Sequence, residues 1–231
     1  MIQIKLFKTL VKIRPDYFVN VVGLWAIATV IGLRQHPERP LLVGIFIGFS
    51  AMFLFMFADF GHSVAHIFSA RRANAPMDEI LVTSGMPRTI YFDNDVSPET
   101  HRKRSFGGPI FSAVCLLLSL TLYFTFPMGS IIHELAGWST IGHAFIFFGA
   151  MSPLPVVDGG VIYKWTMVIH GKSEAEADAI LRKANWVLGG ICILASIVLL
   201  ILKSWIIAAV VLVTGLIPIY FVARRTEKSG I

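Results

Sequence analysis

The sequence is poor in charged residues. Only 15% of its 231 residues are Asp, Glu, Lys or Arg, whereas 55% are hydrophobic and the mean hydropathy is +0.72. A soluble globular enzyme carries more charge on its surface, and a disordered chain has far fewer apolar side chains. The composition therefore excludes both classes and indicates a protein that resides in a membrane.

Cysteine is also scarce. Cys115 and Cys192 fall in separate apolar runs, where a small hydrophobic side chain is as useful as a thiol, so the sequence predicts no disulfide framework. The formal net charge is +6, but the basic residues are dispersed among the loops without an aromatic-basic recognition motif. We therefore expect no nucleic-acid partner, and membrane topology explains the excess of positive charge.

Long apolar runs predict six transmembrane helices, because a helix needs about 20 residues to cross the hydrocarbon. The predicted spans are 18–33, 41–66, 109–126, 131–151, 186–202 and 205–222. The fold class that follows is an all-α membrane protein with one integral-membrane domain, residues 1–231. Its predicted parts are a basic segment (1–17), spans one and two (18–70), a loop (71–108), spans three and four (109–170), and a surface helix with the last two spans and a tail (171–231).

The Lys and Arg residues fall almost entirely on one side of these spans. Seventeen of the twenty lie in the segments 1–17, 71–104, 164–185 and the tail after residue 220, against Arg34, Arg39 and Lys203 on the other side. Short cytoplasmic loops hold the excess of Lys and Arg in membrane proteins. The sequence therefore predicts that both termini are cytoplasmic.

The basic segment 1–17 carries an amphipathic pattern. Lys5, Lys8 and Lys12 fall on one helical face, with the apolar residues largely elsewhere. This pattern predicts an interfacial helix lying on anionic lipid, with a simple basic anchor as the plainer interpretation.

Two other segments outside the spans carry local signals. Residues 78–93 alternate, and their β-branched and aromatic residues flank a Ser-Gly-Met-Pro break, which predicts a small β-hairpin at the cytoplasmic surface. Residues 172–184 begin with a capping box, Ser173 with Glu176, which predicts a short surface helix before the fifth span.

Few ionisable side chains lie within the predicted spans. Because such groups cost several kcal/mol at bilayer depth unless they are paired or bound to metal, each one is a functional candidate. They are Asp59, His62, His66, His143 and Asp158, while His133 and Glu134 fall near the opposite interface and are excluded from the site.

His62 and His66 lie four residues apart on a predicted helix. At 100° per residue their rings project about 40° apart and one turn apart along the axis, which is a chelating geometry. Such a pair is the usual helical half of a zinc site and needs a third protein ligand from elsewhere. The other interpretation is that two buried histidines simply hydrogen-bond.

The segment SPLPVVDGG, residues 152–160, suggests the third ligand. Its prolines and glycines interrupt an apolar stretch, and broken backbone at membrane depth is tolerated where it lines a protein-enclosed or water-filled cavity. Asp158 is the one carboxylate in this break, and the topology puts it near the same membrane face as His62 and His66. An ordinary turn at a helix end is the alternative.

These motifs together resemble the site-2 protease family of intramembrane zinc metalloproteases. The resemblance rests on His62 and His66, on the Gly-Gly-Pro opening of the third span (107–109), and on Ser152-Pro153-x-Pro155-x-x-Asp158-Gly-Gly, and it covers about residues 41–170. It implies a site-2-protease-like core in which His62, His66 and Asp158 bind Zn²⁺. It also implies that Ser152, Pro153 and Pro155 contact a transmembrane helix or membrane-anchored protein as substrate, and that residues 80–92 offer a strand edge to it.

One residue departs from the family motif HExxH. Position 63, where the family has glutamate, is Ser63. That glutamate acts as general acid and base, a role worth about 10² to 10⁴ in rate, and a serine hydroxyl has no suitable proton affinity near neutral pH. The sequence is therefore compatible with a natural non-catalytic homologue, an enzyme with another base, or an inactivated variant of an active parent.

Asp59 lies on the same helical face as the two histidines, three residues before His62. We expect it to orient His62 through the other ring nitrogen, with a replacement base as the alternative. His143 is interpreted as a core histidine, with a transition-state donor or an added ligand as alternatives.

Three functions stay open at the sequence level. The first is intramembrane proteolysis of transmembrane substrate helices, and the second is a pseudoprotease that binds membrane helices without hydrolysis. The third is a proton or metal-ion relay through the intramembrane Asp and His residues.

Overall fold

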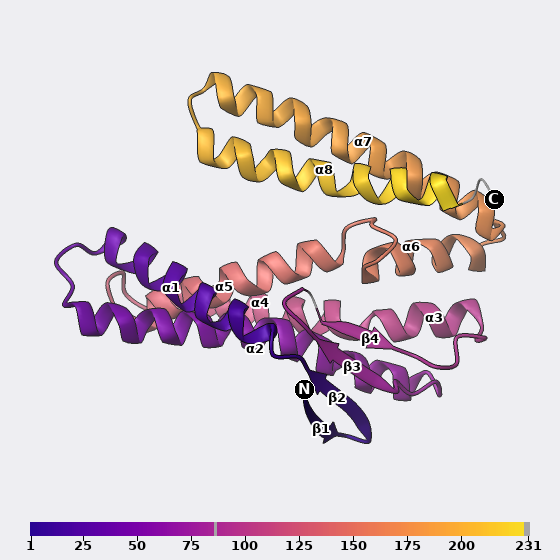
Figure 1. Cartoon of the computed structure of the whole chain (residues 1–231), viewed down its shortest axis with the longest axis horizontal. Coiled ribbons are helices and arrows are strands. Elements are labelled where there is room, and N and C mark those ends of the chain that lie inside the picture. Colours follow the sequence, from indigo (N-terminus) through magenta and orange to yellow (C-terminus); the bar gives the residue numbers. More distant parts are fainter. Residues whose placement is uncertain (86, 229–231) are drawn as a thin grey trace. The chain divides into compact units, whose positions relative to one another are not determined.

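The computed structural model of the chain describes residues 1–85 and 87–228. They form two compact units, Met1–Ala150 and Met151–Ile231, each with its own set of elements (Figure 1). The first unit holds four long helices, one short helix and a sheet, and the second unit holds three helices.

Two helical hairpins build most of the first unit. The helices α1 (Tyr17–Gln35) and α2 (Leu41–Arg72) form one hairpin, and α4 (Gly107–Thr125) and α5 (Ile131–Ala150) form the other, which packs against α2. Small residues allow close packing, since a Cβ at Gly48 would lie 2.7 Å from the backbone N and Cα of Thr29. The predicted spans 18–33 and 41–66 lie within α1 and α2, and the spans 109–126 and 131–151 each extend one residue past the end of α4 and α5.

A four-stranded sheet occupies one end of the first unit. Its strands are β1 (Ile2–Leu6), β2 (Thr9–Ile13), β3 (Glu79–Val82) and β4 (Arg88–Ile90), in the order β1-β2-β3-β4. The pairs β1/β2 and β3/β4 are antiparallel, whereas β2/β3 is parallel.

This sheet confirms one prediction and corrects another. The hairpin expected within residues 78–93 is present as β3 and β4, although residue 86 in its break lies outside the described residues. The interfacial helix expected for residues 1–17 is wrong, because residues 2–13 form a β-hairpin. The residues Ile2, Ile4 and Leu6 alternate along one face of β1, and pairing of β2 with β3, far along the chain, favours the extended form.

The sheet packs on the half of α2 that contains the two histidines. Val11, Ile80 and Val82 from the strands and Ile67 and Ala70 from α2 form one buried cluster. Between the sheet and the third span lies a short helix that the sequence analysis did not predict, α3 (Pro98–Ser105), whose N-cap Ser97 accepts a hydrogen bond from the Thr100 backbone. These contacts fix the C-terminal half of α2 and the start of α4.

The second unit consists of α6 (Asp158–Ile169), α7 (Glu174–Ile201) and α8 (Trp205–Lys228). The capping box of Ser173 and Glu176 is present at the start of α7. The surface helix predicted for 172–184 is not separate, however, because α7 continues without a break into the fifth predicted span. In Figure 1, α7 and α8 lie side by side, and a Cβ at Gly189 would come within 2.9 Å of the Gly215 carbonyl.

Four helical stretches among the described residues are long and apolar enough to cross a membrane. They are Tyr17–Gln35, Leu41–Arg72, Pro98–Thr125 and Glu174–Ile201. Of the other two predicted spans, 131–151 is the helix α5, which is not among these four, and 205–222 lies in α8, whose apolar part is the shorter stretch Ala208–Tyr220. This is the make-up of an integral membrane protein with at least four candidate spans.

The close approach of α1 and α2 leads to a stability prediction. Gly48→Ala places a methyl group against the Thr29 backbone and should destabilise the protein by about 1–3 kcal/mol, the usual cost of overpacking. Gly23→Ala is the matched control, since a Cβ there meets nothing within 4 Å and alanine favours a helix. Thermal unfolding in detergent should show a lower midpoint for Gly48→Ala alone, and equal midpoints would contradict the tight α1–α2 packing.

Candidate metal centre

The two motif histidines lie one turn apart in the C-terminal half of α2. Both are buried, with 8% of His62 and 4% of His66 exposed, and their Nε2 atoms lie 3.4 Å apart. Two Nε2 atoms bound to one tetrahedral zinc at 2.0–2.1 Å would be separated by about 3.3–3.4 Å. The pair therefore fits two adjacent ligand positions around such an ion.

The other ring nitrogen of His66 is held by a backbone carbonyl. His66 Nδ1 lies 3.0 Å from the Arg104 carbonyl oxygen, and Ser69 Oγ donates to the same oxygen at 2.7 Å. Because a carbonyl only accepts, Nδ1 of His66 carries the proton and Nε2 presents its lone pair. This is the tautomer that a metal needs.

His62 is oriented by a serine from α4. Its Nδ1 lies 3.0 Å from Ser112 Oγ, and Ser112 is fully buried. The expectation that Asp59 holds this nitrogen is corrected, since among the described contacts Ser112 takes that place. A serine inside an apolar span was the available sequence signal, although Ser119 in the same span carries the same signal.

The start of α4 is pressed directly against the histidine pair. A Cβ at Gly108 would lie 2.5 Å from His66 Nε2 and would overlap His62 Nε2, and a Cβ at Gly107 would lie 2.5 Å from the Ala65 carbonyl oxygen. Only glycine fits at these two positions. Gly107 thus lets α4 approach the backbone of α2, and Gly108 leaves room beside both Nε2 atoms.

Arg104 fixes the carbonyl that orients His66. Its side chain is almost completely buried, lies 4.0 Å over the Tyr91 ring, and donates to Asn94 Oδ1 at 3.0 Å and to the Asp93 carbonyl at 3.4 Å. The guanidinium thereby ties the end of α3 to the loop after β4. Sequence reasoning treated Arg104 only as a loop charge, because its partners are set by tertiary structure.

Ser63, at the position of the usual glutamate, is turned toward its own helix. It is 3% exposed, and its hydroxyl donates to the Asp59 carbonyl at 3.2 Å, the bond from a serine to the residue four positions earlier. This geometry gives Ser63 neither the charge nor the proton affinity of a general base.

Asp158 belongs to the second unit, where it is the first residue of α6. Residues 151–157 before it form no regular element, which confirms the predicted break. The two glycines that follow Asp158 let this segment fold back closely, since a Cβ at Gly159 would lie 2.5 Å from the Met151 carbonyl carbon. A carboxylate in the first turn of a helix is also favoured by the helix dipole.

The proline-rich segment before Asp158 is anchored within the second unit. Asn185 of α7, which is 1% exposed, donates from Nδ2 to the Pro153 carbonyl and to the Leu181 carbonyl, both at 2.9 Å. Ser152, Pro153 and Pro155 are all half-buried. Sequence reasoning did not single out Asn185, although an asparagine in an apolar helix was a signal.

The remaining ionisable candidates of the first unit lie elsewhere. His143 is 2% exposed and packs edge-on against Phe57 and Phe111, and within the described part of the chain its Nδ1 has no hydrogen-bond partner. This environment agrees with a core histidine. Glu134 forms a salt bridge with Arg39 at 2.5 Å, and no described contact joins either residue to His62 or His66.

The fold is similar to that of the site-2 protease from Methanocaldococcus jannaschii. The TM-score is 0.51 and the sequence identity 13%, over 96% of this chain and 94% of that chain. At this identity the likeness establishes a shared fold. No family model matches the sequence, and no curated protein matches it significantly.

The Ser112 contact leads to a prediction about metal affinity. Ser112→Ala removes the partner of His62 Nδ1, and loss of such a supporting hydrogen bond lowers metal affinity about 10- to 100-fold. Ser119→Ala on the same helix is the control, because Ser119 bonds to Ser139 instead. Competition titration with a zinc chelator should separate the two variants, and equal affinities would contradict the role given to Ser112.

A second prediction concerns the space beside the two Nε2 atoms. Gly108→Ala fills it with a methyl group and should abolish stoichiometric zinc, whereas Gly149→Ala, where a Cβ meets nothing within 4 Å, should not. Elemental analysis of the purified proteins gives the zinc content. Full zinc in Gly108→Ala would show that the ion does not bind between these nitrogens.

Proposed function

We propose that this chain is an intramembrane zinc metalloprotease-like protein whose metal centre is formed by His62, His66 and Asp158. The observation that carries the proposal is the 3.4 Å separation of two buried Nε2 atoms, each on a ring whose Nδ1 is held by a residue of a neighbouring helix. The shared fold with a protein described as a site-2 protease supports the same conclusion.

Asp158 completes the proposed centre as the third ligand. Two neutral imidazoles, one carboxylate and an open position make up a common catalytic zinc site. Asp158 follows the proline-rich segment 152–157 and is the first residue of α6. Its backbone is therefore part of a regular helix, which limits where its carboxylate can lie. A bound zinc ion would supply Lewis-acid polarisation of a peptide carbonyl.

The chain's own residues supply metal binding more completely than proton transfer. The rings of His62 and His66 are oriented, but Ser63 donates its hydrogen to the Asp59 carbonyl and cannot accept a proton as glutamate would. Asp59 remains the nearest carboxylate along α2, three residues before His62. Cleavage of a transmembrane substrate helix therefore depends on Asp59 or on a base from the substrate complex.

A catalytically inactive pseudoprotease is the second candidate. The buried, backbone-bonded Ser63 favours it, because this substitution removes the general base and leaves the metal ligands intact. Such a protein would bind membrane helices without hydrolysing them. A proton or metal-ion relay is less favoured, since Phe57 and Phe111 surround His143 and interrupt a continuous polar path.

A substrate would reach the site from the bilayer. An extended segment of the substrate would then pair with an open strand edge of the sheet. Among the described residues of 80–92, β4 lies at the edge of the sheet, whereas β3 is paired on both sides. The further elements of this proposal are six spans with both termini in the cytoplasm, supported by the distribution of Lys and Arg.

Restoring the missing carboxylate tests the proposal most directly. Ser63→Glu should give cleavage of a transmembrane model substrate at least about 10²-fold faster than the original chain, because it supplies the general base. Ser63→Gln, similar in size but without an ionisable group, is the control and should give no gain. Cleavage is measured in detergent or vesicles by mass spectrometry of the products.

The same preparations separate the outcomes. Zinc in both proteins with no gain of cleavage would favour a helix-binding pseudoprotease. Absence of zinc from the folded original chain and from Ser63→Glu would overturn the metalloprotease-like interpretation.

The third ligand has its own test. Asp158→Asn should lower zinc affinity by orders of magnitude, whereas Asp178→Asn, which only removes an ion pair with Lys164 on the surface of the second unit, should not. Calorimetric titration with zinc measures both. Unchanged affinity in Asp158→Asn would exclude this carboxylate from the centre.

A further inference from the structure

The turn between β1 and β2 is formed by two residues that are poorly suited to it. Phe7 has φ 44° and Lys8 has φ 63°, both in the left-handed region. Two-residue hairpin turns of this kind strongly prefer Asn-Gly, and a bulky residue at positive φ is uncommon. Strain that persists at one place often serves a function there.

The strained turn brings Phe7 into contact with α2. The rings of Phe7 and Phe68 lie 5.0 Å apart, and each residue is still about half exposed, at 49% and 48%. Ile2 and Ile4 of β1 are also half exposed. The hairpin and this end of α2 therefore carry several half-exposed apolar side chains, of which Phe7 and Phe68 are in contact.

This surface lies where α2 leaves the hydrocarbon. The helix has 32 residues, so it is about 48 Å long, against about 30 Å for the hydrocarbon core. Its last turns, which include Phe68, therefore reach the headgroup zone of any bilayer that the helix crosses. Interfacial segments bury Phe, Trp and Leu side chains at the boundary between headgroups and acyl chains.

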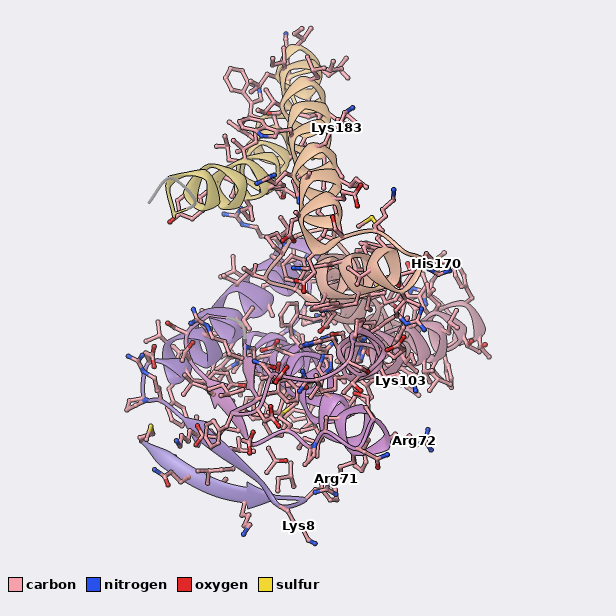
Figure 2. All side chains as sticks on the ribbon, turned by 90° about the vertical axis from the view of Figure 1, so that its right-hand side faces the viewer. Lys8, Arg71, Arg72, Lys103, His170 and Lys183 are labelled. Atoms are coloured by element: carbon pink, nitrogen blue, oxygen red, sulfur yellow. The ribbon has the colours of Figure 1, made fainter. Side chains whose placement is uncertain are left out.

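Basic side chains surround the same place. Figure 2 shows Lys8 at the hairpin tip, with Arg71 and Arg72 at the neighbouring end of α2. Lys103 belongs to the last turn of α3. This turn is joined to α2 by the hydrogen bond that Ser69 donates to the Arg104 carbonyl. Residues 1–10 and 66–77 contain no Asp or Glu, so nothing in these segments neutralises the positive charge.

We propose that the β1–β2 turn and the end of α2 form an interfacial anchor that binds anionic lipid headgroups. Phe7 and Phe68 lie at the boundary of the hydrocarbon, and Lys8, Arg71, Arg72 and Lys103 contact lipid phosphates. Long basic side chains above an aromatic pair suit this arrangement, because the apolar stem stays in the interface and the charge reaches the phosphate layer. The anchor is independent of the metal centre.

A turn-optimised variant separates this role from a structural one. Phe7→Asn combined with Lys8→Gly installs the favoured turn residues, so the hairpin should be at least as stable in thermal unfolding. The full chain is reconstituted into phosphatidylcholine vesicles containing phosphatidylglycerol, and spin-labelled lipids report the preference for the anionic lipid. We expect the variant to lose most of that preference, and a preference equal to that of the original chain would overturn the proposal.

Single changes at Lys8 test the charge. Lys8→Gln should lower the preference for phosphatidylglycerol about fivefold at low ionic strength, the contribution of one basic residue near an anionic surface. Lys8→Arg keeps the charge and should retain the preference. Equal values for the two variants would contradict the proposed headgroup contact.

A depth measurement tests the apolar part. A nitroxide at position 7, in a chain carrying Phe7→Cys, Cys115→Ser and Cys192→Ser, should collide more with oxygen than with a water-soluble nickel complex. The same label at Asp95, in the exposed loop before α3, is the aqueous control and should show the opposite preference. Higher nickel accessibility at both positions would mean that the turn projects into water, or toward a soluble partner, and would overturn the anchor.

Discussion

The candidate site depends on the hydrogen-bond contacts that hold the Nδ1 atoms of two buried imidazoles, His62 and His66. In α2 the partners of the two Nδ1 atoms come from other segments, the Arg104 carbonyl at the end of α3 and the Ser112 hydroxyl in α4. These bonds determine where Nε2 points. They can form only because Gly107 and Gly108 let α4 approach α2 to backbone contact. The metal-binding geometry is thus a property of the α2–α4 interface rather than of the HxxxH motif alone.

In the proposed centre, the residues that would bind the cation are distinct from position 63, where the general base would lie. The Nδ1 contacts described for the two rings come from Ser112 and Arg104 and not from position 63, so a serine at position 63 is compatible with this orientation of the rings. The serine hydroxyl bonds to its own helix, which satisfies it in a buried place at little cost. A chain of this kind can retain the fold and the proposed metal centre of a protease without the residue that transfers the proton. A pseudoprotease needs the same fold and the same metal ligands, but not the general base.

Features with local signals were accessible from the sequence, and those set by distant partners were not. Apolar runs, the capping box at Ser173 and the alternation in 78–93 each correspond to observed elements. The N-terminal hairpin was missed because Phe7 and Lys8 carry no turn signal and because β2 pairs with a strand about 70 residues later. Ser112 and Arg104 lie some 40 to 50 residues from the histidines that they orient, so no spacing rule identifies them.

The parallel pairing of β2 with β3 constrains how the chain is made. These strands flank α1 and α2, so residues 9–13 and 79–82 lie on the same side of any membrane that both helices cross. Until residues 79–82 have been synthesised, which happens only after both helices, β2 is paired with β1 alone and its other edge has no partner. The sheet can therefore be completed only if α1 and α2 have been inserted as a hairpin. If either helix is inserted wrongly, one edge of β2 stays unpaired and can aggregate.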